Sequence, residues 1–218
     1  MFRSMAVSSV YSLILGGLFT LTTFGSIAQD ATAPTFEQET TSIAAALQLT
    51  EGMTVADVGA GDGKYAAFLA DTVGSAGRVY ATEIEQSKVD AISKTVAGKS
   101  SVTVLLGKTE NTELPEQCCD RILLRRVFHH MHHPEPMLKS LLASLKPGGM
   151  IIAIDFLPRH DMSNQDGTPD DHEHGTSVEK LTEHFTAAGF ELVNQVDNWP
   201  SRKEHGKSID YAVLYRRP

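Results

Sequence analysis

The sequence is poor in cysteine, and this shortage excludes a disulfide-stabilised protein. Only two cysteines are present, Cys118 and Cys119, and they are neighbours in the chain. A disulfide prefers Cα atoms that are farther apart than those of adjacent residues, so no disulfide framework is expected. We interpret the pair as small apolar residues at the start of a strand, with a metal or redox role as the alternative.

Clustered positive charge is also missing. The chain has 19 Lys and Arg residues against 27 Asp and Glu residues, which gives a formal net charge of −8, and no basic stripe or arginine-rich run is present. Tight binding of nucleic acid needs many basic contacts to phosphates, so nucleic acid is not an expected partner. With 218 residues, 41% of them hydrophobic, the composition is typical of a globular protein with a sizeable core.

Charge is nearly absent from the N-terminal segment, where Arg3 is the only charged residue before Asp30. Residues 10–28 are mostly apolar, and Ser26-Ile27-Ala28 resembles the small-x-small pattern of a cleavage site. We therefore predict that residues 1–28 are a secretory signal peptide.

The alternative is an uncleaved membrane anchor, because the uncharged span of residues 4–29 is long enough to cross a bilayer. Either version predicts an extracytoplasmic location, periplasmic or secreted. Residues 29–36 then form a short linker, and residues 37–218 form one domain.

The most informative pattern is the stretch from Asp57 to Gly63, which follows the apolar run Met53-Thr54-Val55-Ala56. The run predicts a buried parallel strand, and a strand that ends in glycines before a helix is typical of a nucleotide-binding turn. Glycine permits the tight turn and lets a ligand touch the backbone. The spacing is G-x-G-x-G, and not the G-x-G-x-x-G of dinucleotide sites. With an acid two residues before the first glycine, the pattern favours S-adenosylmethionine over NAD.

Strand and helix patterns alternate along the rest of the chain. Apolar runs predict strands over residues 53–58, 78–83, 102–106, 120–124 and 150–156. Apolar residues at helical spacing predict helices near residues 43–47, over 64–73, near 89–96 and near 178–185. A further helix is predicted from Pro134 to the stop at Pro147-Gly148-Gly149, with Leu145 on its apolar face.

The last two predicted strands, residues 190–196 and 209–215, have no helix between them, so we expect them to pair antiparallel. The whole order predicts an α/β domain with a mixed sheet and helices on both faces. Ligands in such sheets bind beyond the carboxyl ends of the strands.

This order of elements and motifs resembles the class I S-adenosylmethionine-dependent methyltransferases over about residues 36–218. It looks most like small bacterial methyltransferases that carry paired histidines after the fourth strand and a Leu-Lys-Pro-Gly-Gly turn. Here these motifs are Phe128-His129-His130 and Leu145-Lys146-Pro147-Gly148-Gly149. The resemblance implies a Rossmann-like, doubly wound, seven-stranded mixed sheet with an antiparallel closing hairpin. It also implies methyl transfer from S-adenosylmethionine to an acceptor.

The resemblance further implies which residues hold the cofactor. Asp57, Gly59, Gly61 and Gly63 would cradle its methionine end. Glu83, at the end of the second strand, would hold both ribose hydroxyls, because the oxygens of a carboxylate can accept hydrogen bonds from a diol.

Two positions depart from the pattern of the family. Lys108 stands where an acid commonly lies near the adenine, and Thr109 or a backbone carbonyl would then replace that acid. Arg125 closes the fourth strand, where relatives often have Asn or Asp. We include these three residues in the candidate cofactor site.

Four histidines crowd the loop after the fourth strand: His129, His130, His132 and His133. In the resembled family this loop faces the methyl donor. We predict His129 and His130 as catalytic residues, as a general base or as a wall of the site, because imidazole titrates near neutral pH. Metal ligation and structural packing are the alternatives. We assign no metal, since so many neighbouring histidines cannot all point one way.

A second polar cluster, from His160 to His174, falls in the loop predicted over residues 157–176. Loops at this place shape the acceptor pocket in the resembled family, and a solvated loop is the alternative. Trp199 and Tyr211 could line the pocket or cover the last hairpin.

The acceptor itself is not specified by the sequence. The predicted core occupies most of the chain, which favours a small-molecule acceptor over a protein or a nucleic acid. A membrane partner is expected only if the N-terminal segment is uncleaved. The alternatives to an enzyme are a non-catalytic adenosyl-ligand-binding protein and a metal-binding protein on the same fold.

Overall fold

The computed structural model describes residues 34–158, 175–201 and 209–218. These residues belong to one unit that extends from Ala33 to Pro218. The predicted signal peptide, most of the predicted linker and the polar cluster over residues 160–174 lie outside the described residues. Within the described ranges, no helix is long and apolar enough to cross a membrane.

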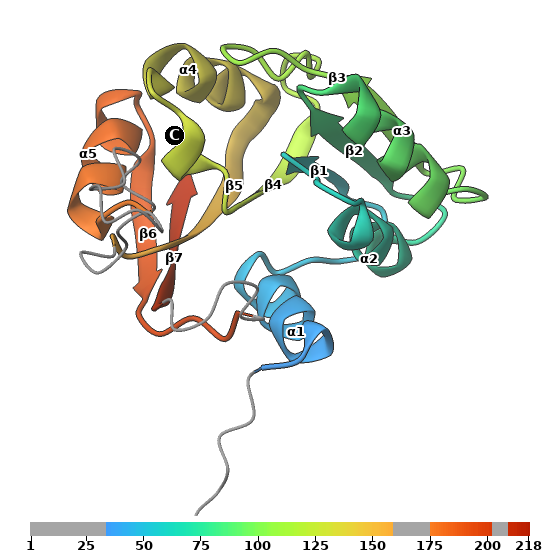
Figure 1. The fold of residues 1–218 in the computed structure, drawn as a ribbon, viewed down its shortest axis with the longest axis horizontal. Coiled ribbons are helices and arrows are strands. Elements are labelled where there is room, and N and C mark those ends of the chain that lie inside the picture. The colour runs from blue at the N-terminus through green and yellow to red at the C-terminus, as the bar shows by residue number, and fades with distance from the viewer. Residues whose placement is uncertain (1–33, 159–174, 202–208) are drawn as a thin grey trace, which may run out of the picture. The chain divides into compact units, whose positions relative to one another are not determined.

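A seven-stranded sheet forms the centre of the fold, in the order β3-β2-β1-β4-β5-β7-β6 (Figure 1). The strands are β1 (Thr54–Val58), β2 (Arg78–Glu83), β3 (Val102–Leu106), β4 (Cys119–Arg125), β5 (Leu145–Phe156), β6 (Glu191–Val196) and β7 (Asp210–Arg216). The first five strands pair in parallel, whereas β7 runs antiparallel to both β5 and β6. The predicted mixed sheet with its antiparallel closing hairpin is therefore confirmed.

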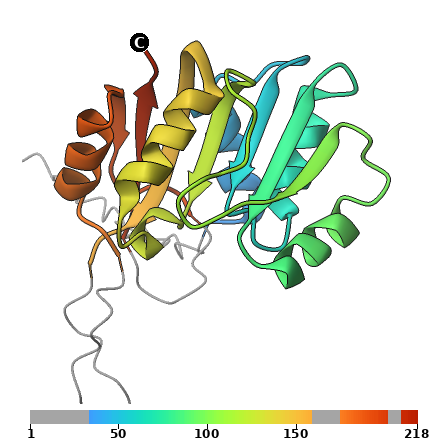
Figure 2. The ribbon, with the colours of Figure 1, turned by 90° about the horizontal axis from the view of Figure 1, so that it is seen from above.

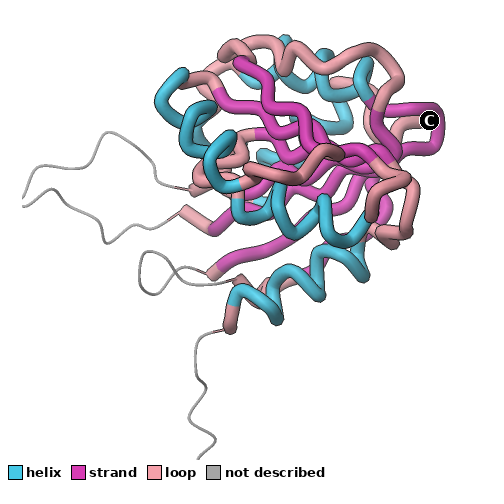
Figure 3. The backbone as a smooth tube through the Cα atoms, turned by 90° about the vertical axis from the view of Figure 1, so that its right-hand side faces the viewer, coloured by secondary structure: helices cyan, strands magenta, loops and turns pink. Residues whose placement is uncertain are grey.

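Helices cover both faces of this sheet (Figures 2 and 3). They are α1 (Phe36–Ala46), α2 (Lys64–Val73), α3 (Gln86–Thr95), the 3-10 turn η1 (Phe128–His130), α4 (Pro134–Ser144) and α5 (Val178–Ala187). The first three helices contribute to one hydrophobic cluster and the last two to another. Alternate residues of β4 serve the two clusters, because Leu123 packs in the first while Ile122 and Leu124 pack in the second.

One predicted boundary is wrong. Helix α4 ends at Ser144 and does not continue to the Pro-Gly-Gly turn. Leu145 already has extended backbone and begins β5, where it pairs with Cys119. The cause is Pro147, which disfavours helical backbone at the preceding residue, so the helix must end earlier than its apolar spacing indicates. Leu145 is still fully buried, but it reaches the core from a strand.

The order of the strands determines where a ligand can bind. After β1 the chain moves to β2 and β3 on one side, whereas β4 lies on the other side of β1. Connections that diverge in this way leave space beyond the carboxyl ends of the two central strands. A ligand site is therefore expected at the turns that follow β1 and β4.

Gly63, the N-cap residue before α2, has a left-handed backbone (φ +81°). A Cβ at this position would lie 3.1 Å from Cα of Ile92. Gly98 is equally left-handed (φ +85°) but has nothing within 4 Å of such a Cβ. We expect Gly98→Ala to lower the free energy of unfolding by about 1 kcal/mol through backbone strain alone. Gly63→Ala should cost about 2–4 kcal/mol, because overpacking against α3 adds to the same strain. Urea unfolding measures both values, and equal costs would show that the contact between α2 and α3 is not tight.

Candidate active site

A cavity of about 1010 Å³ opens at the carboxyl ends of the parallel strands. Val58, Glu83 and Arg125, the last residues of β1, β2 and β4, line it. Among the residues predicted from the sequence, the cavity brings together Gly59, Gly61, Glu83, Lys108, Arg125, His129 and His130. The turns that carry the chemistry thus meet around one space.

The three glycines after β1 have different roles. All have positive φ, but only Gly61 would direct a Cβ into open space, and it lines the cavity. A Cβ on Gly59 would lie 2.4 Å from Cγ2 of Val127, so this glycine allows the turn after β4 to approach closely. Gly63 does not line the cavity, and its lack of a side chain serves the packing of α2 on α3. Ligand access to the backbone is therefore greatest at Gly61.

Glu83 lies beside this turn at the end of β2. Its Oε1 accepts a hydrogen bond from the amide of Gly61 at 3.0 Å, and its Oε2 accepts one from the amide of Ile84 at 3.1 Å. Each carboxylate oxygen can accept more than one hydrogen bond, so both keep capacity for the hydroxyls of a ligand. The side chain is thus fixed in place while it faces the cavity.

Asp57, near the end of β1, is 2% exposed, and its Oδ2 has no hydrogen-bond partner in the described structure. Burial raises the pKa of this carboxyl to about 7, although the positive charge of Arg125 acts in the opposite direction. A buried acceptor without a partner is costly. Asp57 is not among the residues that line the cavity, so the structure does not bring this predicted site residue to its surface.

The predicted adenine region is only partly assembled. Lys108 lines the cavity, but its ammonium group lies 2.7 Å from the carboxylate of Glu113. Thr109 is exposed and is not among the lining residues, which include Asn111 and Thr112 instead. A short bridge between Lys108 and Asn111 turns the chain back, and this turn could not be foreseen from the sequence.

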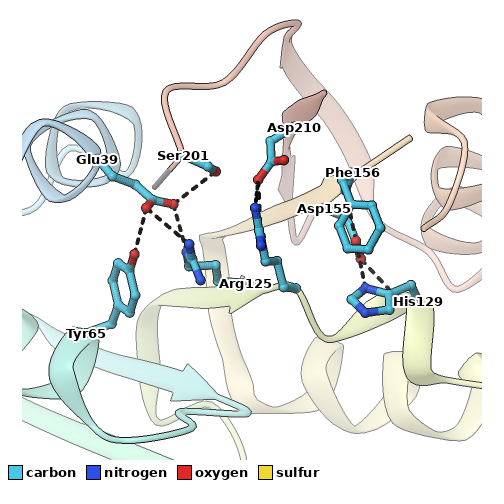
Figure 4. Close-up of polar contacts among 9 residues, drawn as sticks. Glu39, Tyr65, Arg125, His129, Asp155, Phe156, Ser201 and Asp210 are labelled. Atoms are coloured by element: carbon cyan, nitrogen blue, oxygen red, sulfur yellow. Dashed lines mark hydrogen bonds and ion pairs between the residues drawn. The ribbon is translucent and has the colours of Figure 1, made fainter. Parts of the chain in front are cut away.

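His129 is held by an acid that the sequence analysis did not single out (Figure 4). Its Nδ1 lies 2.8 Å from Oδ1 of Asp155, and its backbone amide donates to Oδ2 of the same residue at 3.1 Å. The His129 side chain is 7% exposed, and Asp155 is fully buried near the end of β5. An acid that ends the apolar run Ile151-Ile152-Ala153-Ile154 was the available signal in the sequence.

Aromatic neighbours restrict the same imidazole. The ring centroids of His129 and His130 are 4.0 Å apart, and that of Phe156 is 4.8 Å from His129. His132 and His133 do not line the cavity, and His133 occupies the N-cap position of α4 without a capping hydrogen bond from its side chain. Among the described residues, no group of three or more His, Cys, Asp or Glu side chains could hold a metal ion.

A second buried acid, Glu39 of α1, gathers partners from across the chain (Figure 4). It accepts hydrogen bonds from Arg125 Nε at 2.7 Å, from the hydroxyl of Tyr65 at 2.7 Å and from Ser201 Oγ at 3.1 Å. Arg126 pairs in turn with Asp210 at 2.6 Å. Arg125 therefore contributes to the wall of the cavity with its guanidinium already engaged.

Other residues singled out from the sequence serve the core. Trp199 and Tyr211 each belong to a hydrophobic cluster, and neither lines the cavity. Cys119 is buried at the start of β4 and Cys118 packs beside the same cluster as a free thiol, which agrees with their interpretation as small apolar residues.

Comparison with known proteins bears on this geometry. Residues 56–153, which run from β1 through β5, match the family described as "Methyltransferase domain". The match covers slightly less than half of the 218 residues, so this part of the chain is similar to methyltransferase domains. Among solved structures, a SAM-dependent methyltransferase from Aquifex aeolicus is 27% identical with a TM-score of 0.68, covering 83% of this chain and 90% of that one. The family and this relative imply S-adenosylmethionine as the cofactor.

Two curated relatives of this part of the chain carry names for different reactions. The chain is 28% identical over 106 residues to the ubiquinone/menaquinone biosynthesis C-methyltransferase UbiE of Cupriavidus taiwanensis, covering 48% of this chain and 44% of that protein. It is 35% identical over 111 residues to a protein-L-isoaspartate O-methyltransferase of Methanococcoides burtonii, covering 50% and 52%. The chain thus spans about half the length of these relatives.

The [4+2]-cyclase SpnF shares the fold, with a TM-score of 0.67 and 19% identity over 82% of this chain and 80% of that one. A fold of this type therefore carries more than one chemistry, and the site must decide between them.

The residues at the carboxyl ends of β1 and β2 fit S-adenosylmethionine. The cofactor carries a sulfonium, an ammonium group and ribose hydroxyls, which need negative charge and acceptors. Glu83 has spare acceptor capacity and Gly61 leaves space for a ligand against its backbone, and both residues line the cavity. Asp57 has an oxygen without a partner, but this oxygen is buried behind the lining residues.

The raised pKa of Asp57 predicts a pH dependence of stability. Folded Asp57 has a pKa of about 7, whereas the ordinary value is 3.8, so between these pH values the folded state binds more protons than the unfolded state. The free energy of unfolding should therefore fall as the pH rises from about 4 to about 7. Asp57→Asn should abolish this fall and raise the free energy of unfolding above pH 7, by up to about 4 kcal/mol at about 1.4 kcal/mol per pKa unit.

Urea unfolding across this pH range measures the effect. Asp71→Asn is the control, because Asp71 is an exposed partner of Lys99. An unchanged pH dependence in Asp57→Asn would mean that Asp57 is already ionised in the folded protein.

Proposed function

We propose that this protein transfers a methyl group from S-adenosylmethionine to a small-molecule acceptor. The observation that supports this most is the joint lining of one cavity by the Gly61 and Glu83 turn and by the His129 turn. A volume of about 1010 Å³ is at the upper end of ordinary ligand pockets, which gives room for a cofactor and a small acceptor together.

When bound, S-adenosylmethionine supplies a methyl group that is already activated by a positive sulfonium. The residues of the chain then have to hold, align and desolvate the reactants. Glu83 and the glycine turn fix one side of the cavity, and Val127, Met131 and Met137 line it with apolar surface that excludes water. Alignment of this kind contributes about 7–11 kcal/mol to lowering a barrier.

The relatives leave the acceptor atom open, because one is named as a C-methyltransferase and the other as an O-methyltransferase. The size and the apolar lining of the cavity support a small acceptor. A binding protein without transferase activity is the competing outcome, and labelled methyl transfer distinguishes it.

Cofactor binding should raise the melting temperature of the full chain. S-adenosylmethionine or S-adenosylhomocysteine at 100 times its dissociation constant adds about 2.7 kcal/mol, which corresponds to about 5–10 °C for a chain of this size. Glu83→Gln should lose most of this shift, since an amide cannot accept hydrogen bonds at both of its terminal atoms. Glu191→Gln, at an exposed ion pair with Arg216, should keep it. NAD should give no shift, and the absence of any shift with both adenosyl compounds in folded protein would refute the proposal.

We also infer an extracytoplasmic location, on the basis of the charge pattern and cleavage pattern of residues 1–28. Expression of the full chain in a bacterial host should yield a periplasmic or secreted protein. N-terminal sequencing should then begin at Gln29. A membrane-bound product that retains Arg3 would instead support the uncleaved anchor, and a cytosolic product would contradict both.

A further inference from the structure

We propose that His129 is the general base for an acceptor hydroxyl group and that Asp155 is its positioning residue. The acceptor is accordingly an alcohol or phenol on a largely apolar molecule. This inference rests on the proposed methyl transfer and deepens it by naming the class of acceptor.

Asp155 determines which nitrogen of His129 carries the proton. Its Oδ2 accepts the amide of His129 at 3.1 Å, and its Oδ1 accepts the amide of Phe156 at 2.9 Å. Both oxygens therefore already act as acceptors, so Nδ1 of His129, 2.8 Å from Oδ1, must be the donor of the third hydrogen bond. In the neutral ring, this leaves the lone pair on Nε2.

The surroundings of His129 keep the ring in this orientation. Its side chain is 7% exposed, and its ring centroid lies 4.0 Å from that of His130 and 4.8 Å from that of Phe156. Nε2 lies on the side of the ring away from Asp155, and His129 lines the cavity (Figure 4). A general base needs a fixed ring, and the acceptor would reach Nε2 from the cavity that His129 lines.

The need for a base selects the acceptor. A neutral amine or an ionised thiol can attack a methyl group without prior loss of a proton, whereas a neutral hydroxyl is a weak nucleophile. In the step we infer, the acceptor oxygen forms a bond to the methyl carbon while the bond between that carbon and sulfur breaks. The bonding pair stays on sulfur, which becomes a neutral thioether. The hydroxyl proton moves to Nε2 of His129 and later passes to solvent.

The body of the acceptor is inferred from the other side chains around His129. Val127, Met131, Met137 and Phe156 line the cavity with apolar or aromatic surface. The nearby arginines are already engaged, Arg125 with Glu39 and Arg126 with Asp210. An apolar or aromatic molecule that carries a hydroxyl therefore fits the part of the cavity near His129 better than a strongly anionic molecule does.

The first test reads the tautomer directly and needs no acceptor. Two-bond proton–nitrogen spectra of the ¹⁵N-histidine-labelled full chain at about pH 8 should show His129 protonated at Nδ1, with its signal assigned by its loss in His129→Gln. In Asp155→Asn the amide group cannot accept all three hydrogen bonds, so the Nε2-protonated form should appear. Protonation of His129 at Nε2 in the unaltered protein would overturn the proposal.

The second test compares acceptors that differ in the reacting atom. Radiolabelled S-adenosylmethionine is supplied with catechol, 4-methylphenol and benzyl alcohol, and with aniline as the amine counterpart. We expect transfer to a hydroxyl compound, with kcat reduced about 10²–10⁴-fold in His129→Gln and at least about tenfold in Asp155→Asn. The acid limb of the pH–rate profile should disappear in His129→Gln, and transfer to aniline should change much less.

The matched control is Asp120→Asn. Asp120 also accepts a backbone amide, that of Thr54 at 2.8 Å, and pairs with a basic side chain, Lys146 at 2.7 Å, but it does not line the cavity. Its activity should be unchanged. Thermal unfolding and calorimetric binding of S-adenosylhomocysteine confirm that each variant is folded and holds the cofactor. His129→Gln provides a second variant if Asp155→Asn does not fold.

The outcomes separate this inference from the proposed function. Failure of the unaltered protein to bind S-adenosylhomocysteine would refute methyl transfer itself. Cofactor binding without methylation of any hydroxyl compound would overturn the hydroxyl assignment alone. Equal losses on hydroxyl and amine acceptors in His129→Gln would show that His129 shapes the site without acting as a base.

Discussion

The ion pair between Glu39 and Arg125 is the interaction on which the geometry of the site depends. Glu39 is fully buried and the Arg125 side chain is 9% exposed, so both charges have lost most of their hydration. Such a pair contributes little net stability, but removal of one partner leaves a buried charge and is strongly destabilising. Arg125 donates to both oxygens of Glu39, and Tyr65 and Ser201 each donate a further hydrogen bond to one of them. The pair therefore joins α1, α2, β4 and the chain before β7 beside one cavity.

The same arginine also acts on the buried carboxyl of Asp57. Its charge opposes the effect of burial on Asp57, whose pKa nevertheless rises to about 7. Because Arg125 is closely paired with Glu39, it only partly offsets the cost of ionising Asp57. A positive charge brought close to Asp57 would stabilise its ionised form.

The sequence predicted the fold because its signals are local. Apolar runs and helical spacing located every strand and α-helix of the described residues, although α1 begins at Phe36, well before its predicted apolar positions. The boundary between α4 and β5 lies earlier than predicted, because Pro147 overrides the apolar spacing that includes Leu145. The glycine turn and Glu83 were likewise visible, since they directly follow strands. Partners that are distant in the chain were not visible. Asp155 lies 26 positions from His129, and Ser201 lies 162 positions from Glu39, so no local pattern connects them. Asp57, Gly63 and Thr109 do not line the cavity, because a motif position does not determine whether a residue faces a cavity or the interior of the protein.

The turn after β4 shows how these distant contacts produce a preorganised site. Between Arg125 and His129, three side chains are each held by a carboxylate from a different element: Glu39 of α1, Asp210 of β7 and Asp155 of β5. Arg126 adopts a left-handed backbone (φ +55°), which costs an L-residue about 1–2 kcal/mol. Two contacts of Arg126 offset this strain: its side chain pairs with Asp210, and its backbone amide donates a hydrogen bond to the carbonyl of Ile154 at 2.7 Å. These contacts prevent the strained turn from relaxing away from the cavity. The imidazole of His129 and the two arginines before it are therefore fixed by three buried acids before any ligand binds.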